Sequence, residues 1–256
     1  MYPILINFGG FALHTYGLFV ALGFAFGMLY LSKKTKKLKP QIISQDDLFV
    51  LVMGIIISAM LGARAFFLIF EYKFWLHPFL NIFKVWEGGL TFYGGFILAF
   101  IFLIIYVRKK KISLAKMLDL IAPAAALGHF FGRIGCFMAG CCHGKPTDVP
   151  WGVVFTEPTL SHIVGIPVHP AELYEAFGNL TIFFILNKYN KKERSGGRTF
   201  ALYMLTYSVL RFVCEFFRGD FRGSYIFGLS PAQFISIFLF ICGLIIMYRT
   251  KTPTQD

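Results

Sequence analysis

The residues best suited to chemistry lie between Gly128 and Asp148, where an apolar run leads into a polar, glycine-rich stretch, GHFFGRIGCFMAGCCHGKPTD. Arg133 stands inside the apolar run. An ionisable side chain is costly to bury in a membrane and is by default a functional candidate there. At helical spacing His129, Arg133 and Cys136 fall on one stripe of the helix. The stretch predicts either a cation that binds a ligand or a structural arginine paired with a carboxylate on a neighbouring helix.

Three glycines accompany this arginine. Gly128, Gly132 and Gly135 fall on the adjacent stripe of the same predicted helix. Small residues at this spacing allow the backbone of another helix to approach closely. We therefore expect this helix to combine a cation with a close-packing surface.

Composition restricts the class of protein. The chain has 256 residues, of which 57% are hydrophobic, and its mean hydropathy is +0.66. These values predict an integral membrane protein. We attribute the net charge of +12 to membrane topology and anionic lipid, and expect no nucleic-acid partner. The first fourteen residues contain no Lys or Arg, so we expect no cleavable signal peptide.

Seven apolar segments are near the length that crosses the ~30 Å hydrocarbon core of a membrane. They cover residues 15–31, 48–70, 90–107, 114–138, 172–188, 199–217 and 231–248. We therefore expect an all-α integral membrane protein with about seven transmembrane helices, in which residues 1–256 form a single transmembrane domain. The Gly94-Gly95 pair in the third segment predicts a tilted or locally broken helix start.

The basic residues indicate the orientation. Most Lys and Arg lie in connections that would share one side, namely Lys33–Lys39, Arg108–Lys116, Lys188–Arg198 and the C-terminal end. The positive-inside rule makes that side cytoplasmic, with the N-terminus outside and the C-terminus in the cytoplasm. On the outer side, residues 71–89 predict either a segment lying in the membrane interface or a plain loop with interface aromatics. Residues 139–171 are expected to form an outer loop.

With this orientation, six helices place polar residues at one depth, in the outer leaflet. These residues are His14, Tyr16, Arg64, Tyr93, Arg133, His169, Glu172, Glu175, Arg211, Glu215 and Arg218. Scattered structural ion pairs would need no common depth, so the pattern indicates a site. Several arginines imply an anionic ligand, since the planar guanidinium matches phosphate, and a nearby His or Tyr could remove a proton from a nucleophile. Asp119 lies near the inner side and is expected to be structural and paired with a lysine.

The chain resembles a known family, the prolipoprotein diacylglyceryl transferases. The matching pieces are HTYGL (residues 14–18), LGAR (61–64), VWEGGLTFYGG (85–95), DLIAP (119–123), GRIGCFMAGCCHG (132–144), TDVPWGVVF (147–155), HPAELYE (169–175) and EFFRGD (215–220). Each piece alone is weak, but their order and spacing cover nearly the whole chain.

The resemblance implies transfer of the sn-1,2-diacylglyceryl group of phosphatidylglycerol to the lipobox cysteine of a preprolipoprotein signal peptide. The products would be a thioether and glycerol 1-phosphate. The residues expected to bind phosphatidylglycerol are Arg133, Arg218, Arg64, Gly144 and Glu175, and those expected to be catalytic are Tyr93, Tyr16, His14 and Arg133. We expect a monomer in the bacterial cytoplasmic membrane, with its active site toward the outer leaflet and no cofactor.

The chain departs from better-known members at three positions. Tyr93 replaces the histidine proposed as the family's base, Cys136 replaces an asparagine and Cys141 replaces an acid. Tyrosine has an ordinary pKa of about 10, which makes it a poorer base than histidine at neutral pH unless a nearby cation lowers that pKa. The identity of the base therefore stays open, and the three departures together leave the acceptor open as well.

The cysteines Cys136, Cys141 and Cys142 stand close together in the sequence, followed by His143. The pattern C-x4-C-C-H is not a common zinc spacing, so we expect no metal. A disulfide or small packing residues are the interpretations left open. In either case we expect the three cysteines to be dispensable for the chemistry.

Three other functions compete with this one. The first is a related lipid transferase with another acceptor. The second is a transporter of an anionic lipid or small anion, which would predict a polar path through both leaflets and an inverted repeat. The third is a lipid-binding protein without catalysis.

Overall fold

The structure, a computed structural model, describes residues 3–8, 11–38, 41–70, 89, 91–155, 164–190, 196–220 and 227–250. The chain forms two compact units, one made of Met1–Leu31 with Leu118–Asp256 and the other of Ser32–Met117. The predicted interfacial segment 71–89 lies, apart from Gly89, outside the described residues.

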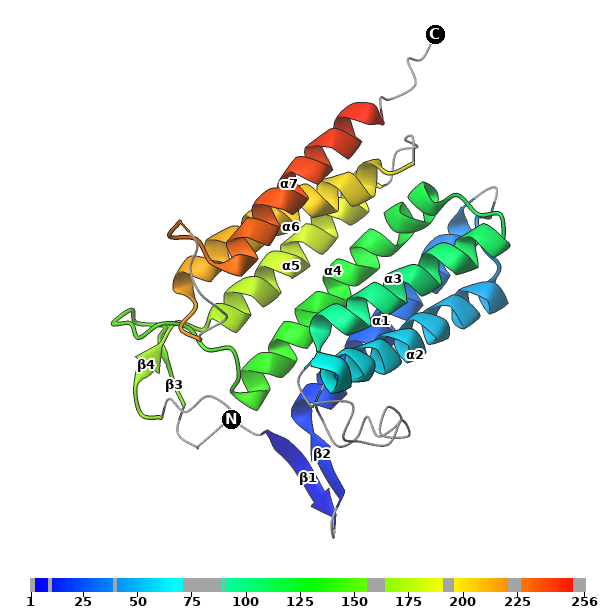
Figure 1. The fold of residues 1–256 in the computed structure, drawn as a ribbon. Coiled ribbons are helices and arrows are strands. Elements are labelled where there is room, and N and C mark those ends of the chain that lie inside the picture. Colours follow the sequence, from blue (N-terminus) through cyan, green and yellow to red (C-terminus); the bar gives the residue numbers. More distant parts are fainter. Residues whose placement is uncertain are drawn as a thin grey trace. The chain divides into compact units, whose positions relative to one another are not determined.

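Seven helices make up most of the described residues (Figure 1), and each corresponds to one predicted span. They are α1 (Thr15–Lys37), α2 (Gln45–Phe70), α3 (Phe92–Lys109), α4 (Leu114–Ala139), α5 (Ala171–Tyr189), α6 (Arg198–Phe217) and α7 (Pro231–Arg249). Six of them are long and apolar enough to cross a membrane. Helix α5 is not among the six, and its 19 residues include the charged Glu172, Glu175 and Lys188.

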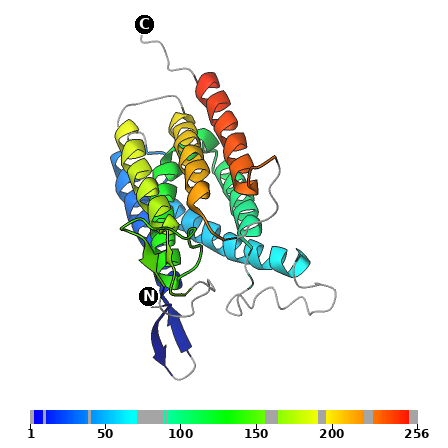
Figure 2. The same cartoon turned by 90° about the vertical axis from the view of Figure 1, so that its left-hand side faces the viewer.

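Two small antiparallel sheets were not part of the all-α prediction. Strands β1 (Ile4–Phe8) and β2 (Phe11–His14) pair, with Ile4 opposite His14. This hairpin projects beyond the start of α1 (Figure 2) and places His14 directly before that helix. Strands β3 (Val153–Val154) and β4 (Pro167–Val168) pair within the predicted outer loop. Strands of two residues carry no periodic pattern that the sequence could reveal.

The core of the first unit lies where α4, α5 and α6 pack together. Ala122 and Ala126 of α4 contact Ile182 and Leu186 of α5, and all four are buried. Aromatic side chains of α5 and α6 cover this cluster, among them Phe183, Phe200, Tyr203 and Tyr207. Small residues on α4 thus let bulky side chains from two neighbouring helices fill the space between them. Helices α5, α6 and α7 lie side by side (Figure 1).

Asp119 of α4 caps the start of α6. Its two carboxylate oxygens accept hydrogen bonds from the backbone N–H groups of Gly197 and Phe200, both at 2.7 Å. The first N–H groups of a helix have no partner within the helix, so a carboxylate there stabilises it. The structural role predicted for Asp119 is therefore seen in its contacts, but these two partners are backbone groups and not the expected lysine.

Glycines let α1 approach α4. A Cβ atom placed on Gly23 would lie 3.1 Å from the carbonyl oxygen of Gly128, and one placed on Gly135 would lie 3.1 Å from Cβ of Phe19. Among the described residues nothing lies within 4 Å of a Cβ placed on Gly132. The predicted close-packing stripe is therefore used at Gly128 and Gly135 but not at Gly132.

The second unit is built on the pairing of α2 and α3. A Cβ atom on Gly62 would clash with the backbone oxygen of Gly94, and one on Gly94 would clash with that of Gly62. The hydroxyl and the N–H of Thr91 both donate to the Ala63 carbonyl, each at 3.1 Å. Helix α3 starts at Phe92 and runs unbroken through Gly94. Of the predicted tilted or locally broken start, the break is therefore absent, and Gly94 instead allows the backbones of α2 and α3 to approach closely.

Candidate functional site

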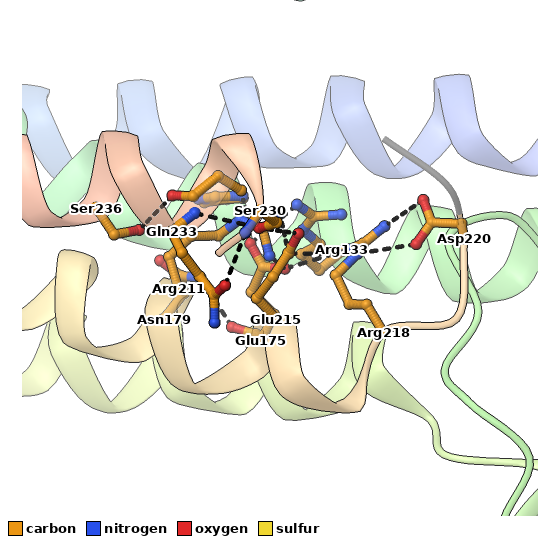
Figure 3. Close-up of polar contacts among 12 residues, drawn as sticks. Arg133, Glu175, Asn179, Arg211, Glu215, Arg218, Asp220, Ser230, Gln233 and Ser236 are labelled. Carbon is orange, nitrogen blue, oxygen red and sulfur yellow. Dashed lines mark hydrogen bonds and ion pairs between the residues drawn. The ribbon is translucent and has the colours of Figure 1, made fainter. Parts of the chain in front are cut away.

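The centre of the candidate site is the buried carboxylate of Glu175, in the second turn of α5 (Figure 3). Arg133 Nη2 lies 2.9 Å from Glu175 Oε1, and His129 Nε2 lies 3.5 Å from the same oxygen. Glu175 Oε2 faces Nη1 of Arg211 at 3.9 Å and Nη1 of Arg218 at 3.7 Å. One carboxylate therefore holds three arginines from α4, α6 and the residue after α6. The predicted stripe of His129 and Arg133 is confirmed by their shared partner.

A second carboxylate, Glu215, organises the α6 face. Arg211 Nη2 lies 2.7 Å from Glu215 Oε2, four residues apart on the helix, and Arg218 Nε lies 3.9 Å from the same oxygen. The hydroxyl of Ser230 donates to Glu215 Oε1 at 2.8 Å. Ser230 also caps α7 in a reciprocal pair with Gln233. The start of α7 is thereby tied to the arginine cluster (Figure 3).

Arg218 also has a partner on its own segment. Its Nε and Nη2 donate to the two oxygens of Asp220 at 3.0 and 2.8 Å, a two-pronged contact. Such pairs are among the strongest hydrogen bonds between side chains. Burial by itself would lower the pKa of Arg218, but the hydrogen bond to Asp220 holds that pKa above its usual range. Arg218 is therefore a permanent cation.

The arginine cluster keeps unused hydrogen-bond donors. Arg133 Nε, Arg211 Nη1 and Arg218 Nη1 are buried and have no hydrogen-bond acceptor among the described residues. Buried polar groups are nearly always satisfied, and leaving one unsatisfied costs about 1–3 kcal/mol. Both oxygens of Glu175 and Oε2 of Glu215 are likewise buried without a hydrogen bond among the described residues, so the donors and acceptors of this cluster are left unsatisfied together and the donors stay available to a bound anion. The site can therefore hold an oxyanion.

Gly144 lies where three backbone segments cross. Its N–H donates to the His169 carbonyl at 3.1 Å, and it forms an isolated β-bridge with Arg218. The N–H of Gly219 donates to the His143 carbonyl at 3.0 Å. A Cβ atom on Gly144 would clash with the carbonyl oxygen of His169. A glycine is required here because the 143–145 loop packs closely against the segment that carries Arg218.

The first unit also contains the catalytic candidates Tyr16 and His14. Tyr16 is the second residue of α1 and is 47% exposed. A Cβ atom on Gly135 would lie 3.3 Å from Tyr16 Cδ2, and Tyr16 is within electrostatic range of Arg133. His14 is exposed at the end of β2. The structure thus brings Tyr16 to the helix that carries Arg133.

The candidates Tyr93 and Arg64 belong to the second unit. Tyr93 is the second residue of α3 and is 61% exposed. Arg64 is buried on α2, with its guanidinium carbon 5.7 Å from the centre of the Phe67 ring. Their roles at the site stay predictions.

Three thiols gather at the end of α4. The Sγ atoms of Cys136, Cys141 and Cys142 all lie within 4.8 Å of one another, and the structure joins none of these three by a disulfide. Cys141 Sγ donates to the Cys136 carbonyl at 3.6 Å. Hydrogen bonding to Cys136 and Cys142 raises the pKa of the Cys141 thiol. His143 instead contacts the Gly144 carbonyl through Nδ1 at 3.0 Å.

The site includes residues that the sequence placed at its depth without a catalytic or binding role, namely Arg211, Glu215 and Glu172, and others that it did not single out. Arg211 and Glu215 share one helix face with Arg218 at i, i+4 and i+7. Asp220 could have been suspected from its position two residues after Arg218. Ser230 had only the capping pattern Ser-x-x-Gln at the start of a helix. Glu172 is fully buried, and both its oxygens have no hydrogen-bond partner in the described part of the chain.

Six helices long and apolar enough to cross a membrane, with a buried cluster of arginines and carboxylates among the helices of the first unit, define a multi-pass membrane protein. Residues 3–249 match the model of a family described as prolipoprotein diacylglyceryl transferase, and the chain belongs to that family.

Two curated relatives are named phosphatidylglycerol–prolipoprotein diacylglyceryl transferase. The protein of Clostridium tetani is 37% identical over 247 residues, which is 96% of this chain and 96% of the relative. The protein of Nitrosospira multiformis is 37% identical over 264 residues, covering 99% of this chain and 89% of the relative. A third relative, from Clostridium perfringens, has the same name followed by the number 2, and is 32% identical over 243 residues, covering 94% and 93% of the two chains.

Proposed function

We propose that this protein transfers the sn-1,2-diacylglyceryl group of phosphatidylglycerol to the lipobox cysteine thiol of preprolipoproteins. The reaction forms a thioether and releases glycerol 1-phosphate. The observation that carries the proposal is the set of buried donors without acceptors on Arg133, Arg211 and Arg218. Family membership over residues 3–249 supports the same reaction.

The arginines act on the leaving group. Negative charge develops on the phosphate oxygen as the carbon–oxygen bond breaks, and positioned donors that match this charge stabilise the transition state. Arg133 and Arg218 hold the phosphate through the donors that their carboxylate partners leave free, and Arg211 supplies a third donor. In a buried site these contacts are stronger than in water.

Glu175 acts through the arginines. Its oxygens lie 2.9 to 3.9 Å from the nitrogens of Arg133, Arg211 and Arg218, so a direct contact with a phosphate would place two anions together. We therefore assign it a positioning role within the phosphatidylglycerol site. Gly144 supports the same site by permitting the loop to pack against the Arg218 segment.

The acceptor thiol must lose its proton, because the thiolate is the nucleophile. The candidate catalytic residues are Arg133, Tyr16 and His14 of the first unit and Tyr93 of the second. Tyr16 is supported by its position against α4 near Gly135. Arg64, a buried cation on α2, is proposed as a further contact for the anionic lipid.

The proposed topology follows the basic residues. Helix α5 would be the seventh span, with its buried Glu172 and Glu175 facing the interior of the protein and not lipid. The N-terminus would be outside and the C-terminus in the cytoplasm, with the site toward the outer leaflet of the bacterial cytoplasmic membrane. Residues 1–256 would work as one transferase domain and as a monomer.

The test is a transfer assay with purified protein. In detergent micelles containing phosphatidylglycerol, a lipobox peptide is expected to gain one diacylglyceryl group, measured by mass spectrometry, with release of glycerol phosphate. The matched substrate is the same peptide with serine in place of the lipobox cysteine, which is expected to stay unmodified. An unmodified cysteine peptide, under conditions in which the Clostridium tetani relative modifies it, would refute the proposal.

The competing functions are less favoured. A transporter or a passive lipid binder would not require membership in a family of transferases. A transferase with another acceptor would modify a different thiol or hydroxyl, which the serine peptide and a set of small thiols would reveal in the same assay.

A further inference from the structure

The three thiols at the end of α4 have the spacing of ligands around one ion. The Sγ atoms of Cys136, Cys141 and Cys142 lie within 4.8 Å of one another. Zinc–sulfur bonds of about 2.3 Å place the sulfurs of a tetrahedral site about 3.8 Å apart. The linear pattern C-x4-C-C is unusual for zinc, but the fold brings the three side chains together all the same.

The backbone produces this convergence. Helix α4 ends at Ala139, and Gly140 follows with φ 68°. The N–H of Cys141 donates to the Cys136 carbonyl at 3.1 Å, so the chain folds back over the last turn of α4. Cys142 also has φ 68°, a left-handed conformation that is uncommon for a residue with a side chain. As a result, Cys141 and Cys142 of the loop lie in one cluster with Cys136 of α4.

The thiol cluster adjoins the arginine cluster. Cys136 follows Arg133 by three residues on one helix face, and Cys142 is within electrostatic range of Arg133 and Arg218. The hydrogen bond from the Gly219 N–H to the His143 carbonyl holds the cysteine loop beside the segment that carries Arg218. A group bound at the thiols would therefore lie next to the proposed phosphate.

We propose that Cys136, Cys141 and Cys142 bind one zinc ion through their thiolates, and that the fourth position of this ion takes the thiol of the acceptor cysteine. The proposal replaces the expectation, drawn from the linear spacing, of a metal-free cluster that is dispensable for the chemistry, because the three Sγ atoms converge in the fold. The inference rests on the proposed function. Three protein ligands with one open position are the pattern of catalytic zinc, whereas structural sites fill all four. The positive charges of Arg133 and Arg218 stabilise a centre that is rich in thiolates.

At neutral pH most acceptor thiol is protonated, and binding to zinc would convert it to the thiolate. A free cysteine thiol has a pKa of about 8.5, and a thiol that binds zinc loses its proton to solvent. The zinc-bound sulfur then donates an electron pair to the glyceryl carbon that carries the phosphate ester. A sulfur–carbon bond forms, the carbon–oxygen bond breaks, and its electron pair leaves on the phosphate oxygen of glycerol phosphate. No oxidation or reduction occurs.

The first experiment measures the metal itself. Protein from zinc-supplemented cells, purified without chelator, is expected to contain about one zinc per chain. The variant with Cys136→Ser, Cys141→Ser and Cys142→Ser is expected to lose it. Cys242→Ser, a free cysteine on α7 outside the cluster, is the matched control and is expected to keep it. No zinc in the wild-type protein, zinc retained in the triple variant, or a disulfide among the three cysteines would overturn the proposal.

The second experiment uses Co²⁺ as a probe and needs no variant. Cobalt-substituted wild-type protein is expected to show thiolate charge-transfer bands, and a lipobox peptide is expected to strengthen and shift them. The serine peptide is expected to leave the spectrum unchanged. A cobalt spectrum without thiolate bands, or the same response to both peptides, contradicts the assignment whether or not the triple variant folds.

Activity separates this inference from the proposed function. Removal of zinc by a chelator is expected to reduce transfer at least 100-fold, on the order of the loss seen when proton removal fails, and added Zn²⁺ is expected to restore it. If the metal-free protein transfers at the full rate, the zinc inference is wrong and the transferase function stands. If the cobalt spectrum responds to the cysteine peptide but no lipid is transferred, the zinc site stands and the proposed function is wrong.

Discussion

At the scale of single residues, Arg133 tests the phosphate contact. Lysine keeps the charge but loses the planar fork that matches phosphate oxygens. Arg133→Lys is therefore expected to lose transfer almost as fully as Arg133→Ala, by about 10²–10³-fold in kcat. The measurement is transfer per folded molecule, with expression and thermal stability in detergent recorded for both variants.

A structural arginine predicts a different result. Arg133 is paired with the buried Glu175 at 2.9 Å, so loss of the charge leaves a buried carboxylate without its nearest partner. In that case both variants would reduce the amount of folded protein, and lysine would be the milder change. A well-folded Arg133→Lys protein with most of its activity would exclude the phosphate contact.

Tyr93 tests the source of proton removal. If its hydroxyl takes part in proton transfer, Tyr93→Phe is expected to lower kcat by about 10²–10⁴-fold. The exposed ring makes a clean test, because 61% of Tyr93 is accessible and phenylalanine keeps its shape. Wild-type rates in Tyr93→Phe would show that the hydroxyl is dispensable, as expected if a metal ion deprotonates the acceptor thiol.

At the scale of the elements, Asp119 tests how α6 is held. Its carboxylate accepts two backbone N–H groups at 2.7 Å, and loss of a helix cap typically costs about 1–2 kcal/mol. Asp119→Ala is therefore expected to lower Tm by about 2–8 °C, measured as thermal unfolding in detergent. Asp46→Ala, in the first turn of α2 and exposed, is the matched control and should change Tm far less.

The same elements show what the sequence could and could not predict. The helices were predictable because each contains an apolar run long enough to cross a membrane. Their partners were not, since helical spacing places Arg133 on a face but does not say that Glu175 of another helix meets it. The thiol cluster depends on left-handed residues at Gly140 and Cys142 that fold the loop back. Such a reversal joins residues that no periodic pattern connects.

At the scale of the whole molecule, the topology is open to a direct test. The basic connections predict that the C-terminus lies in the cytoplasm. A fluorescent protein fused after residue 250 is expected to be fluorescent in cells, whereas alkaline phosphatase fused at the same point is expected to be inactive. The opposite pair of results would reverse the orientation and would place the arginine cluster in the inner leaflet.

The pair of Arg218 and Asp220 has a consequence for turnover. Asp220 already fills two of the donors of Arg218, at 3.0 and 2.8 Å. On the proposed mechanism, the lipid phosphate binds Nη1 of Arg218, which this carboxylate leaves free, so Arg218 holds two anions at once. The product carries close to two negative charges at neutral pH, so three arginines alone would retain it. Repulsion from the neighbouring carboxylate weakens that retention and favours release, and Arg218 keeps a partner between one cycle and the next.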